Sequence, residues 1–385
     1  MNYLRTISVV LTLSLIVSLL SFSGMRVIAV TEDDLSAPSA VLMEASTGKV
    51  LFEKDSHGIR PCASITKVMT LILVMEAIDS GALSYDEMVT ASAHAASMGG
   101  SDIWLEPGET MTVEDMIKAT VVASANDAAV ALAEAVSGTE EEFVRQMNEK
   151  AASLGMKDTV FKNCNGLDEE GHVTSAYDVA LMSRELLKHD RILDFTGIWM
   201  DELRGGKTQI VNTNKLLKSY NGITGLKTGT TSQAGSCITA TAKRDGLELI
   251  AVVLGCSTGN DRFSDARKLL DSGFAGYMMF TPEIPDEAMT TLTVRKGMTD
   301  SVGTVTGEVG SLLLQKGKGS TAQAKVYLPA EVEAPISKGD VIGKLVYESD
   351  GKQIAEYPIA AAEDVKEINF SDVSGLVFSS LSGSG

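Results

Sequence analysis

Hydrophobic and polar residues first alternate along the chain, and a stretch that is apolar at almost every position then follows. This pattern predicts short strands followed by a buried helix. The stretch SAVLMEASTGKVLFEKD has the composition of two strands around a turn at Ser46-Thr47-Gly48. Residues 64–79 then carry apolar side chains on nearly every side of a helix, and Gly81 lies just beyond as a stop signal. Because this helix has no polar face, we expect it to be central and buried.

Apolar positions three and four residues apart dominate the next hundred residues and predict amphipathic helices. Three segments have this spacing: VEDMIKATVVASANDAAVALAEAV, EEEFVRQMNEKAASLG and SAYDVALMSRELLKH. The stretch SCITATAKRDGLELIAVVLGC then predicts a two-stranded hairpin, and a further helix shares one face among Phe263, Ala266, Leu269, Leu270 and Phe274. Strands on both sides of a helical insertion indicate an α+β fold, with one antiparallel sheet built from both ends of the domain.

Short alternating strands with glycine turns follow Pro282 and predict a small all-β C-terminal domain. They are TTLTVRKG, SVGTVTG, QAKVYLPAEV and DVIGKLVYESDGKQIAEYPIAA. The last residues, 369–385, space their apolar side chains like a helix, on a serine- and glycine-rich backbone that forms helices poorly. We expect a weak surface contact or a disordered tail there.

The first residues have the features of an export signal. Arg5 supplies a positive charge, residues 7–22 form an apolar and hydroxyl stretch, and Val27-Ile28-Ala29 offers small residues for a signal peptidase. A retained membrane anchor is the alternative, but the apolar stretch is marginal for crossing a bilayer. We therefore predict an exported, extracytoplasmic protein with four parts: a signal peptide 1–29, a main domain 30–280, a β domain 281–368 and a tail 369–385.

Composition and charge exclude several classes of function. The chain has 385 residues, of which 44% are hydrophobic, enough for two domains with their own cores. Its formal net charge of −18 repels polyanions, so we expect no nucleic-acid partner. The four histidines match no HExxH pattern and no cysteine cluster suggests zinc, so we expect no metal.

The four cysteines are predicted to be free thiols. A two-residue hairpin turn at Asp245-Gly246 would place Cys237 opposite Leu254. Cys256 would then be only a diagonal neighbour, roughly 7 Å away between Cβ atoms, beyond the reach of an unstrained disulfide. The same default applies to Cys62 and Cys164.

A serine and a lysine three residues apart open the predicted buried helix. Their spacing places Ser64 and Lys67 on one helix face, beside the free N–H groups of the helix N-terminus. A neutral lysine can remove the proton of a serine, and burial favours the neutral amine. The S-x-x-K pattern is common, however, and residues 46–49 and 349–352 also match in predicted turns. On this motif alone, a capping Ser64 and an outward-pointing Lys67 explain the sequence at least as well.

Two further motifs favour a catalytic explanation of Ser64 and Lys67 over the purely structural one. Ser124-Ala125-Asn126 is an S-x-N in an apolar helical segment, and Lys227-Thr228-Gly229 is the single K-T-G of the chain. Taken alone, the S-x-N motif is explained equally well by a helix-to-turn junction, and the K-T-G motif by a solvated turn. Another S-x-N, Ser219-Tyr220-Asn221, shows how common that pattern is. What these simpler explanations leave out is the order of the three motifs.

S-x-x-K, S-x-N and K-T-G in this order resemble the signature of penicillin-binding proteins and serine β-lactamases. More narrowly, GSDIWLEPGE, SANDAAVALAEAVSG, FVRQMNEKAASLGMKDTVFKNCNGLDEEGHVTSAYDVALMSREL, NTNKLL and GITGLKTGTTSQAGSC are similar to blocks of the low-molecular-mass D-alanyl-D-alanine carboxypeptidases. These serine peptidases trim peptidoglycan stem peptides. The likeness runs from about residue 36 to 277, and LPAEVEAPISKGDVIGKLVYESDGK resembles that family's C-terminal domain.

The resemblance implies a penicillin-binding fold and a serine-type D-Ala-D-Ala carboxypeptidase with a covalent acyl-enzyme. It makes Ser64 the nucleophile, Lys67 its base and Ser124 a proton relay. The backbone N–H groups of Ser64 and Thr230 would form the oxyanion hole. Neither a metal nor an organic cofactor is required.

The resemblance also assigns the substrate-binding residues. Asn126 would hold the substrate amide, and Lys227 and Thr228 would meet the terminal carboxylate of the D-Ala-D-Ala peptide. Gly229 would leave room for an extended peptide along the strand edge. The expected partners are peptidoglycan stem peptides, with β-lactams as inhibitors. No oligomeric state is predicted.

Three departures limit the resemblance. Cys62, two residues before the predicted nucleophile, is expected to be a small apolar filler. His172, in EGHVTSAYD, matches a family block without an assigned role and is taken as structural. The tail has no basic residue after Lys366, which weakens the expectation of a membrane helix and leaves at most a peripheral membrane contact.

Two alternative functions stay open at this point. A class A-like β-lactamase would need an additional glutamate for deacylation, and no E-x-x-L-N occurs between Ser124 and Lys227. A non-enzymatic cell-wall binding protein would be expected to carry degraded motifs, whereas all three motifs are intact here.

Overall fold

The computed structural model describes residues 30–317, 322–349 and 351–369. The predicted signal peptide and almost all of the predicted tail lie outside the described residues. Within the described part of the chain, no helix is long and apolar enough to cross a membrane.

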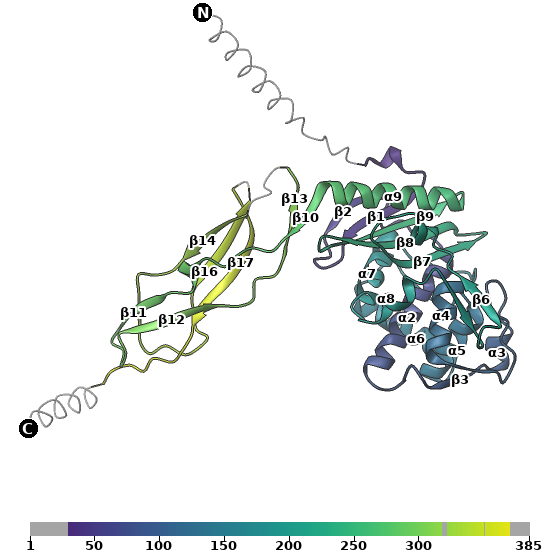
Figure 1. Ribbon diagram of the computed structural model, residues 1–385, viewed down its shortest axis with the longest axis horizontal. Helices are drawn as coiled ribbons and strands as arrows, with labels where there is room; N and C mark the ends of the chain where they lie inside the picture. Colours follow the sequence, from purple (N-terminus) through teal and green to yellow (C-terminus); the bar gives the residue numbers. More distant parts are fainter. Residues whose placement is uncertain (1–29, 318–321, 350, 370–385) are drawn as a thin grey trace, which may run out of the picture.

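A five-stranded antiparallel sheet forms the centre of the first part of the chain (Figure 1). Its order is β2-β1-β9-β8-β7, so the first two strands of the chain pair with strands from its middle. This confirms the predicted sheet built from both ends of the domain. The strands span Ser39–Glu44 (β1), Val50–Lys54 (β2), Ile223–Thr231 (β7), Gly235–Arg244 (β8) and Leu247–Cys256 (β9).

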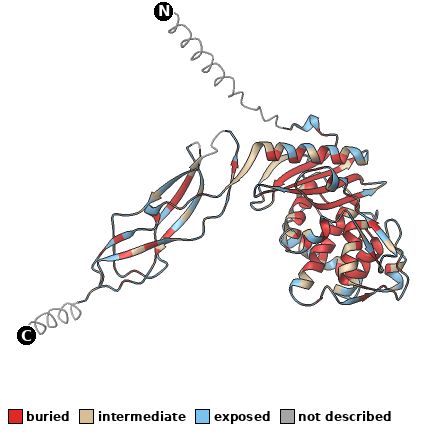
Figure 2. Ribbon diagram, in the orientation of Figure 1, coloured by how far each residue is buried: buried red, intermediate tan, exposed pale blue. Residues whose placement is uncertain are grey.

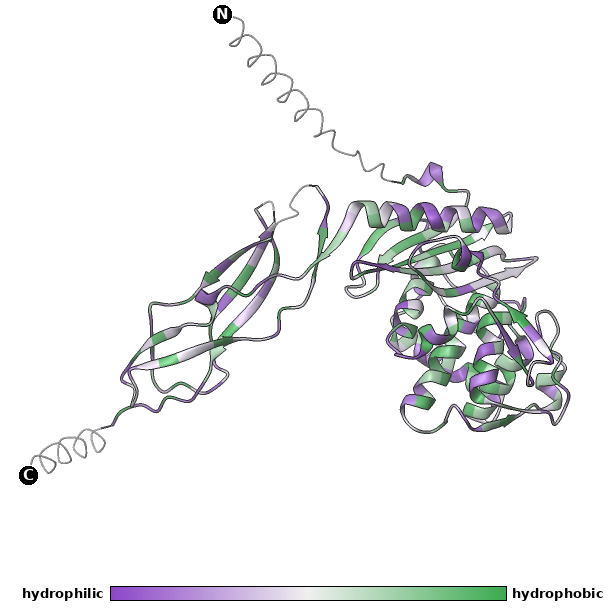
Figure 3. Ribbon diagram, in the orientation of Figure 1, coloured by the Kyte–Doolittle hydropathy of each residue, from purple (hydrophilic) through white to green (hydrophobic). Residues whose placement is uncertain are grey.

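Each face of this sheet packs against a different set of helices. Ala40, Leu42 and Leu249 face the helix α9 (Gly259–Gly276), whereas Val41 and Met43 face the helical region on the other side. The alternation follows from the two-residue period of a strand. In Figure 2 the buried residues fill the sheet and the helices below it, and Figure 3 shows α9 alternating between hydrophobic and hydrophilic residues. The functional motifs must therefore meet where the helical region touches the sheet.

The helical region contains the predicted helices, with two differences. The predicted helix 64–79 begins as a 3₁₀ turn, η2 (Ala63–Thr66), before α2 (Lys67–Asp79). Such a tighter first turn is frequent at helix N-termini. The segment predicted as one helix from Val113 is divided at Ser124, as described below. The remaining helices are α3 (Ala93–Ala96), α4 (Val113–Lys118), the π-helix η3 (Ala119–Ala123), α5 (Asn126–Ser137), α6 (Glu140–Ser153), α7 (Ala176–Leu186) and α8 (Ile192–Thr196).

Short elements complete this part of the structure. Two small hairpins pair β3 with β4 and β5 with β6. Single turns of 3₁₀ helix lie before β1, before β7 and after β10. Their bounds are Glu32–Asp34 (η1), Met88–Thr90 (β3), Thr110–Thr112 (β4), Met200–Leu203 (β5), Thr208–Val211 (β6), Lys215–Lys218 (η4) and Asp286–Ala288 (η5).

The C-terminal part is all β, as predicted. Its six-stranded sheet has the order β14-β16-β17-β12-β11-β15, and its apolar residues form clusters of their own, such as Leu345, Tyr347 and Ile359. The strands are Thr291–Arg295 (β11), Ser301–Thr306 (β12), Gln323–Tyr327 (β14), Glu331–Glu333 (β15), Val341–Ser349 (β16) and Lys352–Ala361 (β17). A two-stranded sheet, β10 (Tyr277–Phe280) with β13 (Leu312–Gln315), joins this part to the end of α9.

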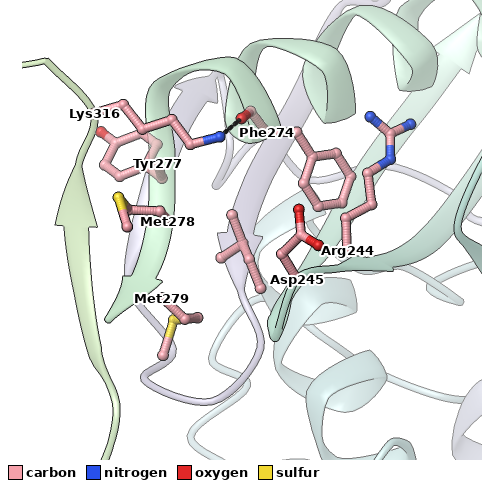
Figure 4. A pocket seen from close by; sticks show the side chains of 8 residues that line it. Arg244, Asp245, Phe274, Tyr277, Met278, Met279 and Lys316 are labelled. Carbon is pink, nitrogen blue, oxygen red and sulfur yellow. Dashed lines mark hydrogen bonds between the residues drawn. The ribbon is translucent and has the colours of Figure 1, made fainter. Parts of the chain in front are cut away.

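A pocket lies at this joint, and its positively charged side chains already have partners within the protein (Figure 4). Lys316 Nζ donates to the carbonyl of Phe274, 2.7 Å away, near the C-terminal end of α9. The guanidinium of Arg244 lies 4.3 Å from the centre of the Phe274 ring and donates to the Asn221 carbonyl. The pocket is lined by Arg244, Asp245, Leu247, Phe274, Tyr277, Met278, Met279 and Lys316, none of which the sequence predicts to be functional. Its polar contacts stabilise the joint.

The four cysteines are free and buried, but the predicted hairpin register holds only in part. Arg244 pairs with Leu247 as expected for a turn at Asp245-Gly246. Near the other end the register shifts, and Ser236 pairs with Cys256. Ile238 pairs with Val253, so two residues of β9, Leu254 and Gly255, lie opposite Cys237 alone. This bulge in β9 replaces the predicted one-to-one pairing of Cys237 with Leu254.

A shortened chain tests where the first folding unit ends. Residues 30–280 contain the two apolar clusters that lie on the two faces of the five-stranded sheet, so we expect this chain to unfold in one cooperative thermal transition. A chain ending at residue 258 lacks α9, whose Ala266, Leu269 and Leu270 are fully buried. We expect that chain to be unfolded or insoluble, as measured by circular dichroism on heating. Equal stability of the two chains would contradict the conclusion that α9 packs as part of the core of this unit.

Candidate active site

The turn at the start of α2 places a serine hydroxyl beside a lysine amine. Lys67 Nζ lies 3.0 Å from Ser64 Oγ. Ala63, immediately before the serine, has a φ of 51°, a backbone conformation that residues with side chains rarely adopt. Strained backbone of this kind clusters at functional sites, where the surrounding structure maintains it.

Two carbonyl oxygens from distant segments hold the lysine amine in place. Lys67 Nζ donates to Asn126 Oδ1 and to the backbone carbonyl of Asn165, each 2.6 Å away. The lysine side chain is completely buried. A neutral amine has two hydrogens, which match these two acceptors, and one lone pair, which is left for the hydroxyl of Ser64. The surroundings of Lys67 therefore suit an amine that accepts the proton of the serine.

Burial favours that neutral form. It lowers the pKa of Lys67 to about 7, against the smaller opposing effects of Cys164 and Asp127. A lysine with this pKa is largely neutral at slightly alkaline pH and can act as a general base. The alternative of an outward-pointing Lys67 is wrong.

The S-x-N motif lies at a break between two helices. The π-helix η3 ends at Ala123, the next residue, Ser124, has a left-handed φ of 61°, and α5 begins at Asn126. This break turns the Ser124 side chain toward the sheet, where its Oγ accepts a hydrogen bond from Lys227 Nζ at 2.8 Å. The π-helix is a form often found at functional sites. The helix-to-turn junction considered for this motif is present, and it is what brings Ser124 to the site.

Asn126 is oriented by a loop that a buried carboxylate anchors. Its Nδ2 donates to the Gly99 carbonyl and its backbone N–H to the Ser101 carbonyl, both at 2.6 Å. The neighbouring Asp127 accepts the backbone N–H groups of Ile103 and Leu105. The carboxylate thus fixes the loop, and the loop fixes the amide that holds Lys67.

The K-T-G motif lies in β7, an edge strand of the five-stranded sheet, and not in a solvated turn. Lys227 is 2% exposed, and its Nζ contacts Ser124 Oγ and the Thr228 carbonyl. Its pKa is lowered well below the usual value, first by burial and then by the positive charges of Lys67 and Arg262. Three basic side chains, Lys67, Lys227 and Arg262, therefore converge, and a bound anion would favour the charged form of Lys227.

The outer edge of β7 is covered along part of its length. Thr196 Oγ1 donates to the Thr224 carbonyl and Asn214 Nδ2 to the Gly225 carbonyl. At the other end, the carboxylate of Asp168 accepts the hydroxyl of Thr231 at 2.5 Å. The stretch between these contacts, residues 226–230, carries the K-T-G motif and Thr230.

Two hydroxyl groups of this stretch have partners that the sequence interpretation did not include. Thr228 Oγ1 lies 2.5 Å from Thr213 Oγ1. Thr230, which is exposed, accepts at its Oγ1 from Arg262 Nη1, 2.8 Å away, and the same nitrogen donates to the Gly229 carbonyl. Arg262 therefore ties α9 to the strand that carries the K-T-G motif.

Two glycines permit the close approach of the segments around Ser64. A Cβ atom at Gly229 would lie 2.7 Å from the Cys62 carbonyl oxygen and 3.0 Å from the Ser64 nitrogen. At Gly166, which has a φ of 88°, it would lie 2.0 Å from the Ala63 carbonyl oxygen. The predicted reason for Gly229, space for an extended peptide, is therefore corrected, because backbone of this chain occupies that space.

The structure thus brings together all the residues predicted from the three motifs, and it adds others. The additional residues that the sequence interpretation missed are Asp127, Asn165, Gly166, Thr213 and Arg262. Their contacts are made by backbone atoms or join segments far apart in the chain, which sequence patterns do not show. Only the block NGLDEEGH, which contains a glycine with positive φ, could have indicated any of them. In the described part of the chain, no group of three or more His, Cys, Asp or Glu residues could hold a metal ion.

Comparison with known proteins agrees with this geometry. A family model described as D-alanyl-D-alanine carboxypeptidase matches residues 26–258. The chain belongs to this family. A second model, described as the C-terminal domain of penicillin-binding protein 5, matches residues 277–367.

Individual family members are similar over most of their length. The D-alanyl-D-alanine carboxypeptidase DacF of Bacillus subtilis is 46% identical over 338 residues, which is 87% of each chain. The crystal structures of penicillin-binding protein 5 from Haemophilus influenzae align with a TM-score of 0.75 at 32% identity, covering 88% of this chain and all of that one. Penicillin-binding protein D2 of Listeria monocytogenes, in its ampicillin-bound form, aligns at 35% identity with a TM-score of 0.57, covering 62% of this chain and 98% of that one.

These matches support the carboxypeptidase interpretation over its alternatives. The model that matches the main domain is that of the carboxypeptidases, and a second model matches the C-terminal all-β domain, which also argues against a β-lactamase. The intact motifs and their convergence argue against a non-enzymatic wall-binding protein.

Gly229→Ala tests the close approach of β7 to the nucleophile. The added Cβ would push the strand away from Ser64, and a displacement of about 1 Å can reduce a reaction rate about 100-fold. We therefore expect acylation by a fluorescent penicillin to slow by about that factor.

Gly307→Ala, in the C-terminal β domain, is the control, because a Cβ atom at Gly307 meets nothing within 4 Å and its φ is not in the left-handed region. We expect it to react at the wild-type rate. Equal rates for the Gly229→Ala variant and the wild type would show that acylation does not need the close approach of β7 to Ser64.

Proposed function

We propose that this protein is an exported serine D-Ala-D-Ala carboxypeptidase that removes the terminal D-alanine from peptidoglycan pentapeptide stems. The observation that carries the proposal is the buried amine of Lys67, held by two carbonyl oxygens and 3.0 Å from Ser64 Oγ. A hydroxyl in this position can form a covalent acyl-enzyme without a metal or organic cofactor.

Acylation begins when the neutral amine of Lys67 takes the proton of Ser64. The serine Oγ bonds to the carbonyl carbon of the penultimate D-alanine, and the backbone N–H groups of Ser64 and Thr230 stabilise the oxyanion. The bond to the terminal D-alanine then breaks, and its nitrogen receives the proton that Lys67 took from Ser64, relayed through the hydroxyl of Ser124. Lys227 holds that hydroxyl at 2.8 Å. In the second half of the cycle, water attacks the ester and gives a proton to Lys67, which passes it to Ser64 Oγ as the bond between Ser64 and the acyl group breaks.

The substrate is positioned by its carboxylate and its extended backbone. Lys227 and Thr228 meet the terminal carboxylate of the stem peptide, whose negative charge favours the protonated form of Lys227. Residues 227–230 of β7 pair with the peptide as an added strand, and Asn126 uses the second hydrogen of its Nδ2 for the substrate amide. Gly229 contributes by allowing this strand to lie against Ser64.

β-Lactams are proposed as inhibitors that acylate the same serine. The relative with ampicillin bound supports this proposal. The β-lactam presents a strained amide carbonyl to Ser64 and a carboxylate to Lys227 and Thr228. We propose that it forms an ester that water releases slowly.

The substrate also implies where the protein acts. Peptidoglycan lies outside the cytoplasmic membrane, so an enzyme that trims it must be exported. We propose that residues 1–29 are a cleaved signal peptide and that the tail, 369–385, makes at most a peripheral membrane contact.

Intact-mass measurement after incubation with a penicillin tests the nucleophile. We expect one penicillin adduct on the wild-type protein and none on Ser64→Ala, because the hydroxyl that forms the ester is gone. Thermal unfolding of both proteins serves as the control for folding. An adduct on the Ser64→Ala variant would remove Ser64 from its proposed role.

The pH dependence of acylation tests the base. Lys67 is active when neutral, and its pKa is lowered to about 7 by burial. We therefore expect the acylation rate constant to be constant above that pKa and to fall about tenfold per pH unit below it. Lys67→Arg keeps the positive charge at every accessible pH, so we expect it to be inactive. A rate that stays constant from pH 8 to about pH 5 would contradict the role of Lys67.

A further inference from the structure

A chain of hydrogen bonds runs behind the candidate nucleophile and involves two residues that the motifs leave without a role, His172 and Cys62. His172 is 4% exposed, and its Nε2 lies 2.7 Å from Thr66 Oγ1. Thr66 is the third residue of the turn Ser64-Ile65-Thr66-Lys67. The threonine hydroxyl lies 3.5 Å from Cys62 Sγ, and this thiol contacts the Ala63 carbonyl at 3.8 Å.

The direction of this chain follows from its first member. The backbone N–H of Lys162 can only donate, and it donates to His172 Nδ1 at 3.1 Å. A neutral imidazole that accepts at Nδ1 carries its hydrogen on Nε2. That hydrogen is therefore donated to Thr66. The Thr66 hydroxyl is then free to donate to Cys62 Sγ, and the thiol to donate to the Ala63 carbonyl.

Every group in the chain thus uses its hydrogen in the same direction, toward the residue before Ser64. Ala63 is the residue with a φ of 51°, which needs support from its surroundings. The ring of His172 is itself fixed by an edge-on contact with Phe161, whose ring centre is 5.8 Å away. Burial keeps the imidazole neutral, with its pKa lowered to about 4.

The same loop also sets the partner of the nucleophile. Asn165, between Lys162 and His172, supplies the carbonyl that holds Lys67 Nζ. Gly166 lies directly against the Ala63 carbonyl. One loop, residues 161–172, therefore contacts both the base and the backbone that carries the serine.

We infer that His172 is a positioning residue for acylation: its Nε2–H holds Thr66 and, through Cys62, the strained backbone at Ala63, so that Ser64 stays aligned with Lys67. This inference rests on the proposed role of Ser64. His172 does not touch the substrate, and its loss is expected to lower the acylation rate constant without weakening the initial binding of the β-lactam.

Two substitutions at His172 separate its contact with the turn from its contact with Lys162. His172→Gln places an amide N–H near the position of Nε2, so it keeps a donor for Thr66 and loses the acceptor for Lys162. His172→Asn places an amide oxygen near the position of Nδ1, so it keeps the acceptor and loses the donor. Thr66→Val removes the hydroxyl that accepts the hydrogen of His172 Nε2, and Thr66→Ser keeps a hydroxyl at that position.

The experiment measures the acylation rate constant and the dissociation constant separately, with a slowly reacting β-lactam, together with the thermal unfolding midpoint. We expect His172→Asn and Thr66→Val to acylate about 30- to 100-fold more slowly with an unchanged dissociation constant. The His172→Asn/Thr66→Val double variant should be no slower than either single variant, because both remove the same hydrogen bond. His172→Gln and Thr66→Ser should stay within about threefold of the wild type.

The outcomes distinguish this inference from the proposed function. If the wild-type protein forms no adduct at Ser64, the proposed function fails. If the wild type reacts and His172→Asn reacts equally fast, or if both His172 variants slow in proportion to their loss of thermal stability, His172 is merely structural and the inference is overturned. His57→Asn, at an exposed histidine paired with Asp158, serves as the control and should react like the wild type.

Discussion

The burial of one lysine beside one serine is the constraint on which the rest of this structure depends. A charged amine in the protein interior is unfavourable, so Lys67 can remain buried only as a largely neutral base with fixed acceptors. Asn126 and the Asn165 carbonyl provide those acceptors, and they come from segments that lie 59 and 98 residues further along the chain. The fold must therefore bring three distant segments together before the serine has any useful reactivity.

The layered architecture meets this requirement. The sheet built from both ends of the first domain leaves β7 at its edge, directly beside the helical region that carries Ser64 and Ser124. Close contact across this boundary depends on Gly229 and Gly166, where any side chain would collide with backbone. On the other face of the sheet, Arg262 of α9 reaches the Gly229 carbonyl, so the layer farthest from the helical region also helps to fix the motif strand.

Much of this arrangement could be predicted from the sequence, because strong periodicity and short motifs are local signals. The apolar run after Ser64 predicted a buried helix, and the hairpin at Asp245-Gly246 predicted two adjacent strands. A junction at Ser124 was only one of two explanations of its motif, because the residues around it have good helical periodicity, and the left-handed backbone of Ser124 was not predicted. The Asn165 carbonyl could not be found, since any residue has a carbonyl and only tertiary contacts make this one a partner of Lys67. Gly229 was recognised as important for a reason that the packing then replaced.

An unpaired strand edge is open to other chains as well as to a substrate, and many proteins aggregate through such edges. In β7, Thr196 and Asn214 occupy the first carbonyl groups of the edge, and Asp168 closes its far end through Thr231. The remaining opening is five residues long, from Leu226 to Thr230. It is long enough for the end of a short peptide and too short for a stable intermolecular sheet, so the contacts that define the cleft also protect the protein from pairing with copies of itself.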